Sequence, residues 1–269
     1  MSKEKVSLFH KLHLNPLPLI LPNAWDAGSA RLIENLGAPA VATSSAGVAW
    51  SLGYRDGRWL PVEEAIAAAA RIVRAVEVPV SFDIENGYSD DPREVAAAVV
   101  RLAQIGVAGI NLEDGADAPK LMVAKIEAIR DALAGTGAGV FVNARTDVIL
   151  AGLTDPARQV AEVIRRGRLY AAAGADGLFV PGLRHEGDIK AVAAGVSLPL
   201  NVMAWAGLAD AAALAQLGVR RLSAGSAIPQ AALGTAEGLI HGFLETGASE
   251  PLFTASKPFG ELQKLFRGA

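Results

Sequence analysis

Short runs of β-forming residues alternate with amphipathic, alanine-rich stretches along most of this chain. Strands separated by helices pair in parallel through right-handed crossovers, and eight such strands close a barrel. The pattern therefore predicts an α/β fold of the (β/α)8 TIM-barrel type. The eight expected strands are residues 17–21, 40–43, 78–82, 109–112, 140–143, 177–180, 199–203 and 220–223, and the clearest expected helices are residues 61–76, 92–105, 119–134, 156–173 and 208–217.

Capping signals support these boundaries. Asp91 is followed by a proline and, at the third helical position, by Glu94, which is typical of a helix start. Asp155 precedes Pro156 in the same way, and Asp26 is expected to cap a helix over residues 27–36. A doubly wound sheet would need a G-x-G-x-x-G turn, which the chain lacks. We expect one domain over residues 1–269.

The residues after 226 exceed what the barrel needs. They predict a long helix over residues 227–244, then a proline-containing loop and a short amphipathic end over residues 259–266. An apolar terminal helix with no barrel position left often packs on a neighbouring subunit. The tail therefore predicts a homo-oligomer.

Composition excludes several classes of function. The 269 residues have a net charge of −3, so no basic excess favours nucleic acid. The absence of cysteine excludes disulfides, thiolate metal sites and thiol catalysis. The longest uncharged run, residues 35–54, contains Pro39 and several hydroxyl residues and is a poor membrane helix. The N-terminus lacks the apolar segment of a signal peptide. We expect a cytoplasmic protein without a membrane partner.

Polar residues gather where the predicted strands end, which is the end that carries the active site in such barrels. So many polar groups at one rim would be unfavourable without partners or a ligand. The site is therefore expected there. In strand order the residues are Asn23, Trp25 and Asp26; Thr43, Ser44 and Ser45; Asp83 and Glu85; Glu113 and Asp114; Asn143, Arg145 and Asp147; Asn201; and Ser223 and Ser226.

The carboxylates in this set indicate a metal site. Asp83 and Glu85 stand two residues apart, and Glu113 follows the next strand, so the three can converge on one cation. Oxygen ligands without His or Cys suit a hard ion, Mg²⁺ or Mn²⁺. Arg145 offers a fork for a carboxylate. The set predicts a small anionic ligand chelated to a metal.

Six ordered segments carry a family resemblance: Asn23-Ala24-Trp25-Asp26, Thr43-Ser44-Ser45, Gly53-Tyr54-Arg55-Asp56, Asp83-Ile84-Glu85-Asn86-Gly87-Tyr88, Leu112-Glu113-Asp114 and Asn143-Ala144-Arg145-Thr146-Asp147. Together they resemble the isocitrate lyase and phosphoenolpyruvate mutase superfamily from about residue 20 to residue 230. The resemblance implies a magnesium-dependent barrel that makes or breaks C–C or P–C bonds beside a 2-oxo acid. It also implies a tetramer, or dimer of dimers, that exchanges a C-terminal helix.

The resemblance assigns roles to residues of this chain. Asp83 would ligate the metal, with Glu85 and Glu113 acting directly or through water. Ser44 and Ser45 would bind the substrate carboxylate and oxo group. By the same resemblance Arg145 would pair with a carboxylate or the developing charge, and Asp56 would stand near the reacting group. From their positions at strand ends, Trp25 and Asn201 are also expected among the substrate-binding residues.

The acid–base part of the family pattern is missing. Lyases of this superfamily have a K-[KR]-C-G-[HS] segment after the fourth strand, whereas here Glu113-Asp114 is followed by residues 115–120, GADAPK. The Lys-Thr-Asn segment and the histidine of the mutase branch are also not seen. The favoured function is a lyase acting on a small 2-oxo or 2-hydroxy acid through an enolate. A P–C bond enzyme, with Arg55, Arg58 and Lys120 as its only candidate cations, and a non-catalytic 2-oxo acid binder remain alternatives.

Structural roles compete with some of these assignments. Asp114 is as well placed to cap the next helix as to act in a site. Arg145 could instead bridge structural carboxylates such as Asp147. Asp83 and Glu85 could be a solvated pair.

Overall fold

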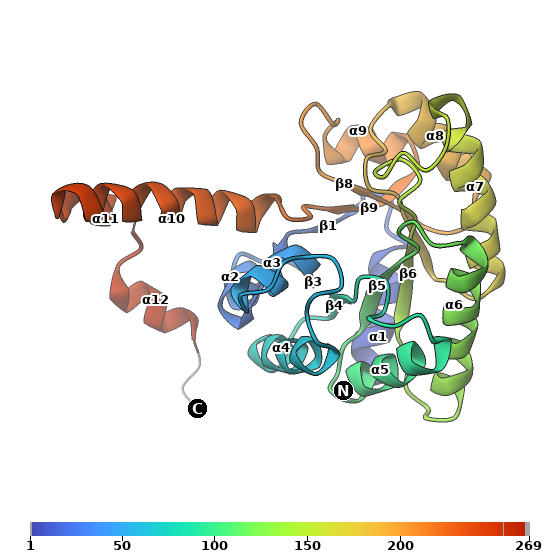
Figure 1. Cartoon of the computed structure of the whole chain (residues 1–269), viewed down its shortest axis with the longest axis horizontal. Helices are drawn as coiled ribbons and strands as arrows, with labels where there is room; N and C mark the ends of the chain where they lie inside the picture. The colour runs from blue at the N-terminus through green and yellow to red at the C-terminus, as the bar shows by residue number, and fades with distance from the viewer. Residues whose placement is uncertain (1, 255, 267–269) are drawn as a thin grey trace.

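A computed structural model describes residues 2–254 and 256–266. In this part of the chain the structure is a nearly closed barrel of nine parallel strands that alternate with helices, with the C-terminal helices outside it (Figure 1). The predicted TIM-barrel fold is confirmed. The strands are β1 Leu19–Leu21, β2 Asn23–Ala24, β3 Val41–Thr43, β4 Val80–Asp83, β5 Gly109–Glu113, β6 Phe141–Arg145, β7 Gly177–Phe179, β8 Leu200–Met203 and β9 Val219–Ser223.

The first barrel strand is divided in two, which explains why nine strands stand where eight were expected. Strand β1 pairs with β9, whereas β2 pairs with β3. Pro22 separates them, and a proline has no N–H to donate to a ladder. The two short pieces together connect the last strand to the rest of the sheet and bring its two edges together.

Helices cover the outside of the barrel, and their caps follow the sequence signals. Asp26, Asp91 and Asp155 each accept a hydrogen bond from a backbone N–H of the helix that follows, so all three predicted caps are confirmed. The helices are α1 Ser2–Leu12, α2 Ala27–Asn35, α3 Ser45–Ser51, α4 Val62–Ala75, α5 Pro92–Gln104, α6 Pro119–Ala134, α7 Pro156–Ala172, α8 Glu186–Gly195, α9 Ala211–Gln216, α10 Ala227–Thr246, α11 Glu250–Thr254 and α12 Phe259–Leu265.

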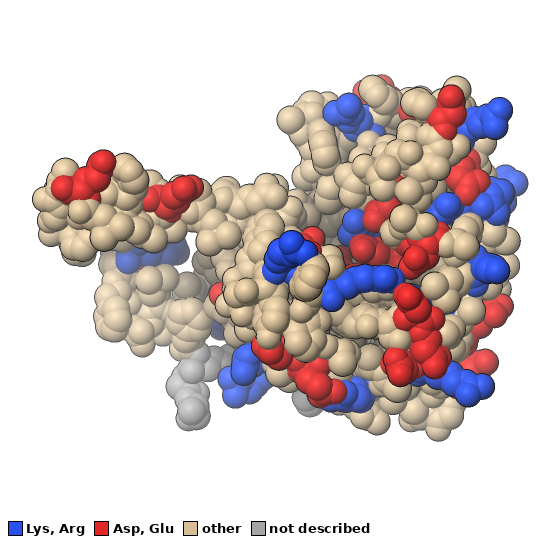
Figure 2. Space-filling model, viewed as in Figure 1, with Lys and Arg blue, Asp and Glu red and all other residues tan. Residues whose placement is uncertain are grey.

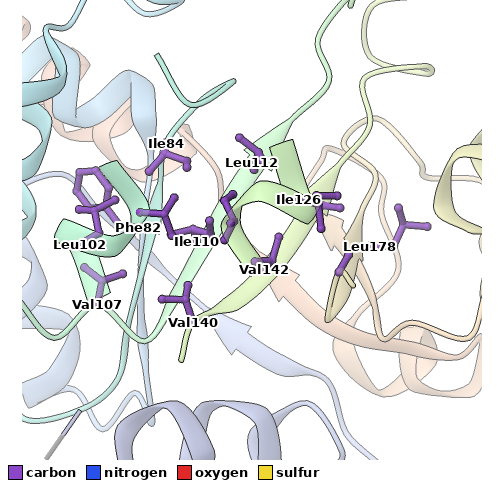
Figure 3. Packing of buried hydrophobic residues seen from close by; sticks show 14 of the residues in the cluster. Phe82, Ile84, Leu102, Val107, Ile110, Leu112, Ile126, Val140, Val142 and Leu178 are labelled. Atoms are coloured by element: carbon purple, nitrogen blue, oxygen red, sulfur yellow. The ribbon is translucent and has the colours of Figure 1, made fainter. Parts of the chain in front are cut away.

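The main hydrophobic core lies between the strands and the surrounding helices. Phe82, Ile110 and Leu112 point outward from β4 and β5 and pack with helix residues such as Leu102 and Ile126 (Figure 3). Alternate residues of a strand point to opposite faces. The residues between these apolar positions therefore point into the barrel.

The interior of the barrel is unusually polar. Barrel interiors are commonly filled by Val, Ile and Leu, but here the inward positions of neighbouring strands pair Asp83 with Asn111, Asn111 with Asn143, and Asn201 with Arg221. One step nearer the carboxyl ends, Glu113 pairs with Arg145. The fold thus builds a column of polar side chains that leads to the predicted site.

Helix α1 closes the opposite end of the barrel. Its Phe9 is fully buried, and the ring lies edge-on to Phe141, with ring centroids 5.4 Å apart. His13, just after the helix, stacks on the same Phe141 ring at 4.2 Å. A Cβ on Gly109 would lie 2.6 Å from the Phe9 ring, so this position needs glycine. Helix α1, with Phe9 and His13 packed on Phe141, forms an apolar plug at this end of the barrel. The carboxyl end is therefore the accessible end.

The C-terminal helices α10, α11 and α12 project from the barrel, and α12 turns back toward it (Figure 1). Leu265 of α12 is buried beside α2, where the Arg31 Nε donates to its carbonyl oxygen at 2.6 Å. The tail therefore contacts its own barrel, although Phe253 and Phe259 are 69% and 78% exposed. None of the described helices is both long enough and apolar enough to span a bilayer.

Candidate active site at the carboxyl ends of the strands

A cavity of about 680 Å³ lies at the carboxyl ends of the strands. A larger hollow of about 850 Å³ runs along α10, but it is mainly apolar and lies away from the carboxylate cluster. The barrel cavity is therefore the candidate active site, because its lining contains the charged and polar side chains. Its polar lining comprises Asn23, Thr43, Ser44, Ser45, Asp56, Asp83, Asn111, Arg145, Ser223, Ser226 and Gln230.

Asp83, the last residue of β4, reaches the cavity from inside the barrel. Its Oδ1 accepts from the Glu85 backbone N–H at 3.0 Å, and its Oδ2 accepts from Asn111 Nδ2 at 3.0 Å. The hydroxyl of Thr43 accepts from the Asp83 backbone N–H. These contacts fix the carboxylate while leaving lone pairs on both oxygens, so the side chain can still accept a ligand.

Glu85 stands in a turn of unusual backbone conformation. Its φ is +52°, and Gly87 and Tyr88 follow with φ values of +92° and +63°. Non-glycine residues rarely occupy this region, and when they do they often belong to functional sites. Lys125, buried on α6, holds the turn by donating to the Asn86 carbonyl at 2.8 Å. The turn keeps Glu85 beside Asp83 rather than facing solvent.

Arg145 joins two carboxylates at the end of β6. Its Nη1 lies 2.7 Å from Glu113, and its Nε and Nη2 donate to the two oxygens of Asp147 at 2.7 and 3.1 Å. The alternative prediction that Arg145 bridges Asp147 is therefore confirmed by these contacts. Arg145 also lines the cavity. A guanidinium carries five N–H donors, so donors remain for a ligand.

Asp114 does not cap the next helix. It is buried and accepts from Arg166 Nη1 at 2.8 Å, from the Tyr170 hydroxyl at 2.5 Å and from the Asp147 backbone N–H at 3.0 Å. Ala118 occupies the cap position of α6 instead. The interpretation of Asp114 as a cap is wrong. It anchors the segment that presents Asp147 to Arg145.

The carboxylates repel one another in a largely buried site. Burial raises the pKa of Glu113 to about 8 against the lowering effect of Arg145, and Asp83, Asp147 and Glu85 raise it further. Burial likewise raises the pKa of Glu85 to about 7 and raises that of Asp83. All three side chains are buried or nearly so, which makes the solvated-pair interpretation wrong. Arg145 only partly offsets the negative charge of these carboxylates.

Asp56 is brought over the cavity by the segment between α3 and α4. Next to it, the Arg58 backbone N–H donates to Glu85 Oε2, and Arg58 Nη2 pairs with Asp90 at 2.8 Å and Asp117 at 3.1 Å. The last two contacts are exposed and individually weak. This segment therefore contacts Glu85 directly and brings Asp56 to the lining of the cavity.

The other predicted site residues divide into two groups. Ser44 and Ser45 line the cavity, and Ser44 Oγ accepts from Gly47 N–H at 3.3 Å, which leaves its own hydroxyl hydrogen free to donate. Trp25 and Asn201 are not among the lining residues. Asn201 lies deeper in the barrel, bonded to Asn143 and Ser223. Trp25 packs beside α3, close to Gly47.

Sequence reasoning missed Asn111. It lines the cavity and contacts Asp83 directly. It stands two residues before Glu113, so it shares a face of β5 with a predicted site residue. This spacing could have predicted Asn111 as a site residue.

The donor set fits a hard divalent cation. Glu85 Oε1 is a buried oxygen without a hydrogen-bond partner in the described part of the chain, and such an atom needs a ligand or water. No three His, Cys, Asp or Glu side chains among these residues are grouped closely enough to hold an ion together. Mg²⁺ usually takes one or two carboxylates and several waters. Direct binding by Asp83, with Glu85 and Glu113 reached through water, is compatible with the geometry.

Fold and site together define a (β/α)8-barrel protein with a carboxylate and arginine cluster at its carboxyl end. Residues 9–244 match the family model described as phosphoenolpyruvate phosphomutase. The chain belongs to this family, and the prediction of an enzyme in the isocitrate lyase and phosphoenolpyruvate mutase superfamily is confirmed.

Several relatives cover most of the chain. It is 38% identical over 262 residues to an uncharacterized protein of Mycobacterium tuberculosis, covering 95% of this chain and 94% of that protein. An oxaloacetate decarboxylase of Ectopseudomonas mendocina is 32% identical, covering 68% of this chain and 64% of the decarboxylase. A Burkholderia cenocepacia structure, provisionally named a phosphonomutase, is 41% identical with a TM-score of 0.84, covering 88% and 99% of the two chains.

Proposed function

We propose that this protein is a magnesium-dependent lyase that cleaves a C–C bond in a small 2-oxo acid, with Mn²⁺ as a possible substitute. The 2-oxo dicarboxylate oxaloacetate is the first candidate substrate. The observation that carries the proposal is the cavity in which Asp83, Arg145 and the two serines Ser44 and Ser45 face one another. Glu85 and Glu113 are not among the cavity-lining residues; burial raises their pKa, to about 7 and about 8, and a bound cation would favour their charged forms.

The chain's own residues account for recognition of such an acid. The hydroxyls of Ser44 and Ser45 would donate to the substrate carboxylate and 2-oxo oxygen. The remaining N–H groups of Arg145 would face the second carboxylate or the charge that develops during cleavage. A bound Mg²⁺ would act as a Lewis acid toward the 2-oxo group.

Decarboxylation suits a site without the family's cysteine segment. When a carboxylate leaves from the carbon next to the 2-oxo group, the C–C bonding electrons move into an enolate and CO₂ departs. No base is needed to start that step, and a proton is required only afterwards, at the carbon that lost CO₂. Asp56, which lines the cavity, is the acid–base candidate for delivering this proton. The relationship to oxaloacetate decarboxylases points the same way.

A P–C bond enzyme is the second candidate because of the family model and the Burkholderia relative. A phosphonate would require additional cations in the cavity. Arg55 lies over the Trp59 ring at 4.2 Å, and Arg58 is paired with Asp90 and Asp117. Neither these arginines nor Lys120 lines the cavity, so a carboxylate substrate is favoured.

Substrate turnover separates the candidates. The purified protein should be incubated with Mg²⁺ and, in turn, oxaloacetate, a 2,3-dialkylmalate and phosphonopyruvate, with pyruvate, other 2-oxo acids and phosphate measured as products. We expect metal-dependent release of pyruvate from oxaloacetate above the rate of the metal alone. Phosphate release from phosphonopyruvate would favour the second candidate. Tight binding of a 2-oxo acid without turnover of any substrate would favour the third alternative, a non-catalytic 2-oxo acid binding protein.

A further inference from the structure

Arg221 is a cation sealed inside the barrel. It lies on β9, between Leu19 of β1 and Asn201 of β8, and none of its surface is exposed. Its Nη2 donates to Asn111 Oδ1 at 3.2 Å and to Ser81 Oγ at 3.4 Å. The guanidinium carbon lies 5.8 Å from the centre of the Phe9 ring, which belongs to the apolar plug.

This placement is unfavourable for a purely structural residue. The Arg221 Nε and Nη1 atoms are buried without a hydrogen-bond partner in the described chain, and no carboxylate there forms an ion pair with this residue. Buried charges without a paired partner are strongly destabilising, and a well-packed apolar residue would commonly serve stability better. The retained charge therefore points to a task inside the barrel.

The contacts of Arg221 lead to Asp83 through one side chain. An arginine can only donate hydrogen bonds, so the oxygen of the Asn111 amide has to face Arg221. Asn143 Nδ2 donates to the same oxygen at 2.9 Å. The Asn111 nitrogen must then point the other way, where it donates to Asp83 Oδ2 at 3.0 Å. Arg221 thus decides which end of the Asn111 amide meets Asp83.

Without that constraint the amide could turn over. A reversed amide would place its oxygen against the Asp83 carboxylate, so that two acceptors would face each other. The carboxylate would then lose a hydrogen bond that fixes its direction. Asn143 alone is a weaker constraint, because its amide can also turn and it shares its nitrogen with Asn201 Oδ1 at 3.0 Å.

We propose that Arg221 is a positioning residue that orients the Asn111 amide and thereby holds the Asp83 carboxylate in its ligand-binding direction. The proposal deepens the proposed function, since it rests on Asp83 as the residue that binds the metal. Groups behind a metal ligand of this kind typically contribute about 10–100-fold to metal affinity.

The test uses Arg221→Met, which keeps an unbranched apolar stem and removes the guanidinium with its donors. Arg130→Met is the matched control, because Arg130 donates to the Gly174 and Val140 carbonyls and to Asp176 at the other end of the barrel and does not contact Asn111. Two quantities are measured in the full-length proteins. One is Mg²⁺ affinity by calorimetry; the other is the Asn111 side-chain amide signal in ¹H–¹⁵N spectra of the metal-free protein.

We expect Arg221→Met to weaken Mg²⁺ binding by about 10-fold or more and to shift and broaden the Asn111 amide signal. Arg221→Lys, which still donates, should restore affinity to within about threefold of the parent. Arg130→Met should lower stability and leave both quantities unchanged. A folded Arg221→Met protein with the parent's Asn111 signal and Mg²⁺ affinity would overturn the proposal.

Two further outcomes are distinguishable. If the parent itself does not bind Mg²⁺, the proposed function fails, while an unchanged Asn111 signal in Arg221→Met would separately overturn the positioning role. If Arg221→Met does not fold, Arg221→Leu replaces it, because leucine likewise has no donor for Asn111 Oδ1. Parent-like affinity and Asn111 signal in that variant would equally overturn the proposal.

Discussion

Arg145 organises the charged side of the cavity with a single planar group. Its contacts to Glu113 and Asp147 come from different edges of the guanidinium, and both partners are largely shielded from solvent. A fork of donors in one plane can hold two carboxylates and still offer hydrogen bonds to a third group. This geometry makes the shape of the side chain as important as its charge.

Replacement of Arg145 by lysine tests that role. Lysine keeps the positive charge but cannot donate along two directions of one plane. We expect Arg145→Lys to weaken binding of a 2-oxo dicarboxylate by about 10-fold or more while changing Mg²⁺ affinity by less than about threefold. Separate calorimetric titrations measure the two affinities. Equal losses for metal and acid would contradict the assignment of Arg145 to the organic ligand.

Residues at strand ends were predictable, whereas their supporting partners were not. Asp83, Ser44, Ser45 and Arg145 follow strands directly, and the structure brings them to one cavity. Arg221 carries no comparable signal, because an arginine inside a strand of a soluble protein is ordinarily expected at the surface. The paired register of strands distant in sequence determines its surroundings, and a single sequence does not contain that register.

At the scale of elements, the N-terminal helix α1 could not be predicted from the sequence pattern. The sequence pattern predicts no helix at residues 2–12, yet they form one whose Phe9 and Val6 are buried against the barrel. The eight strands and the five clearest helices were predicted because their periodicity and caps are strong. The division of the first strand at Pro22 was not, since it depends on pairing with two different neighbours.

The α1 plug predicts a specific sensitivity to acid. The pKa of His13 is lowered from 6.5 to about 3, mainly by burial and also by the nearby Arg221 cation. The native state therefore binds fewer protons than the unfolded state between these values, so this group's stabilising contribution is complete above pH 6.5 and is lost as the pH falls toward 3. At pH 5 the loss is about 2 kcal/mol relative to pH 7.

Urea unfolding of the parent and His13→Asn at pH 7 and pH 5 measures this effect. Asparagine can still donate to the Phe9 carbonyl, as His13 Nδ1 does at 2.7 Å, but it does not titrate. We expect the parent to lose about 2 kcal/mol more than the variant between the two pH values. Equal losses would show that protonation of His13 does not contribute.

At the scale of the whole molecule, the C-terminal tail is the least self-contained part. The view in Figure 2 shows acidic and basic side chains close together on the barrel face, whereas the projecting helices are largely uncharged. Leu233, Ile240 and Leu244 of α10 are more than half exposed, as are Phe253 and Phe259 farther along. Residues 255 and 267–269 of the predicted tail lie outside the described residues.

We predict that this surface is covered by another copy of the chain in a dimer or tetramer. Exposed apolar area of this extent is unusual for a free monomer. Ile240→Lys combined with Phe259→Lys should shift the oligomer toward monomer, while Leu36→Lys, an exposed position on α2's end, should not. Sedimentation velocity measures the distribution. A parent that is monomeric at micromolar concentration would contradict the prediction.

We also propose that the barrel with its tail unfolds as one domain. Arg31 of α2 donates to the Leu265 carbonyl of α12, so the first barrel helix after β2 and the C-terminal tail share a contact across 234 positions. The assignments of Asp56, Trp25 and Asn201 stay predictions. Of these, Asp56 has the strongest support, because it lines the cavity.

The central claim is that Asp83 binds the metal on which recognition of the acid depends. Titration calorimetry with Mg²⁺, followed by a 2-oxo dicarboxylate, should be performed on the parent, Asp83→Ala, Asp83→Asn, Glu85→Gln and Glu113→Gln. Asp155→Asn serves as the control, because it removes a carboxylate that only caps α7. The account predicts that Asp83→Ala abolishes metal-dependent binding, that Asp83→Asn is nearly as harmful, and that the glutamate variants lose about 10-fold through water-mediated contacts. If Asp83→Ala binds both ligands as the parent does, the carboxylate cluster is structural and the account is wrong.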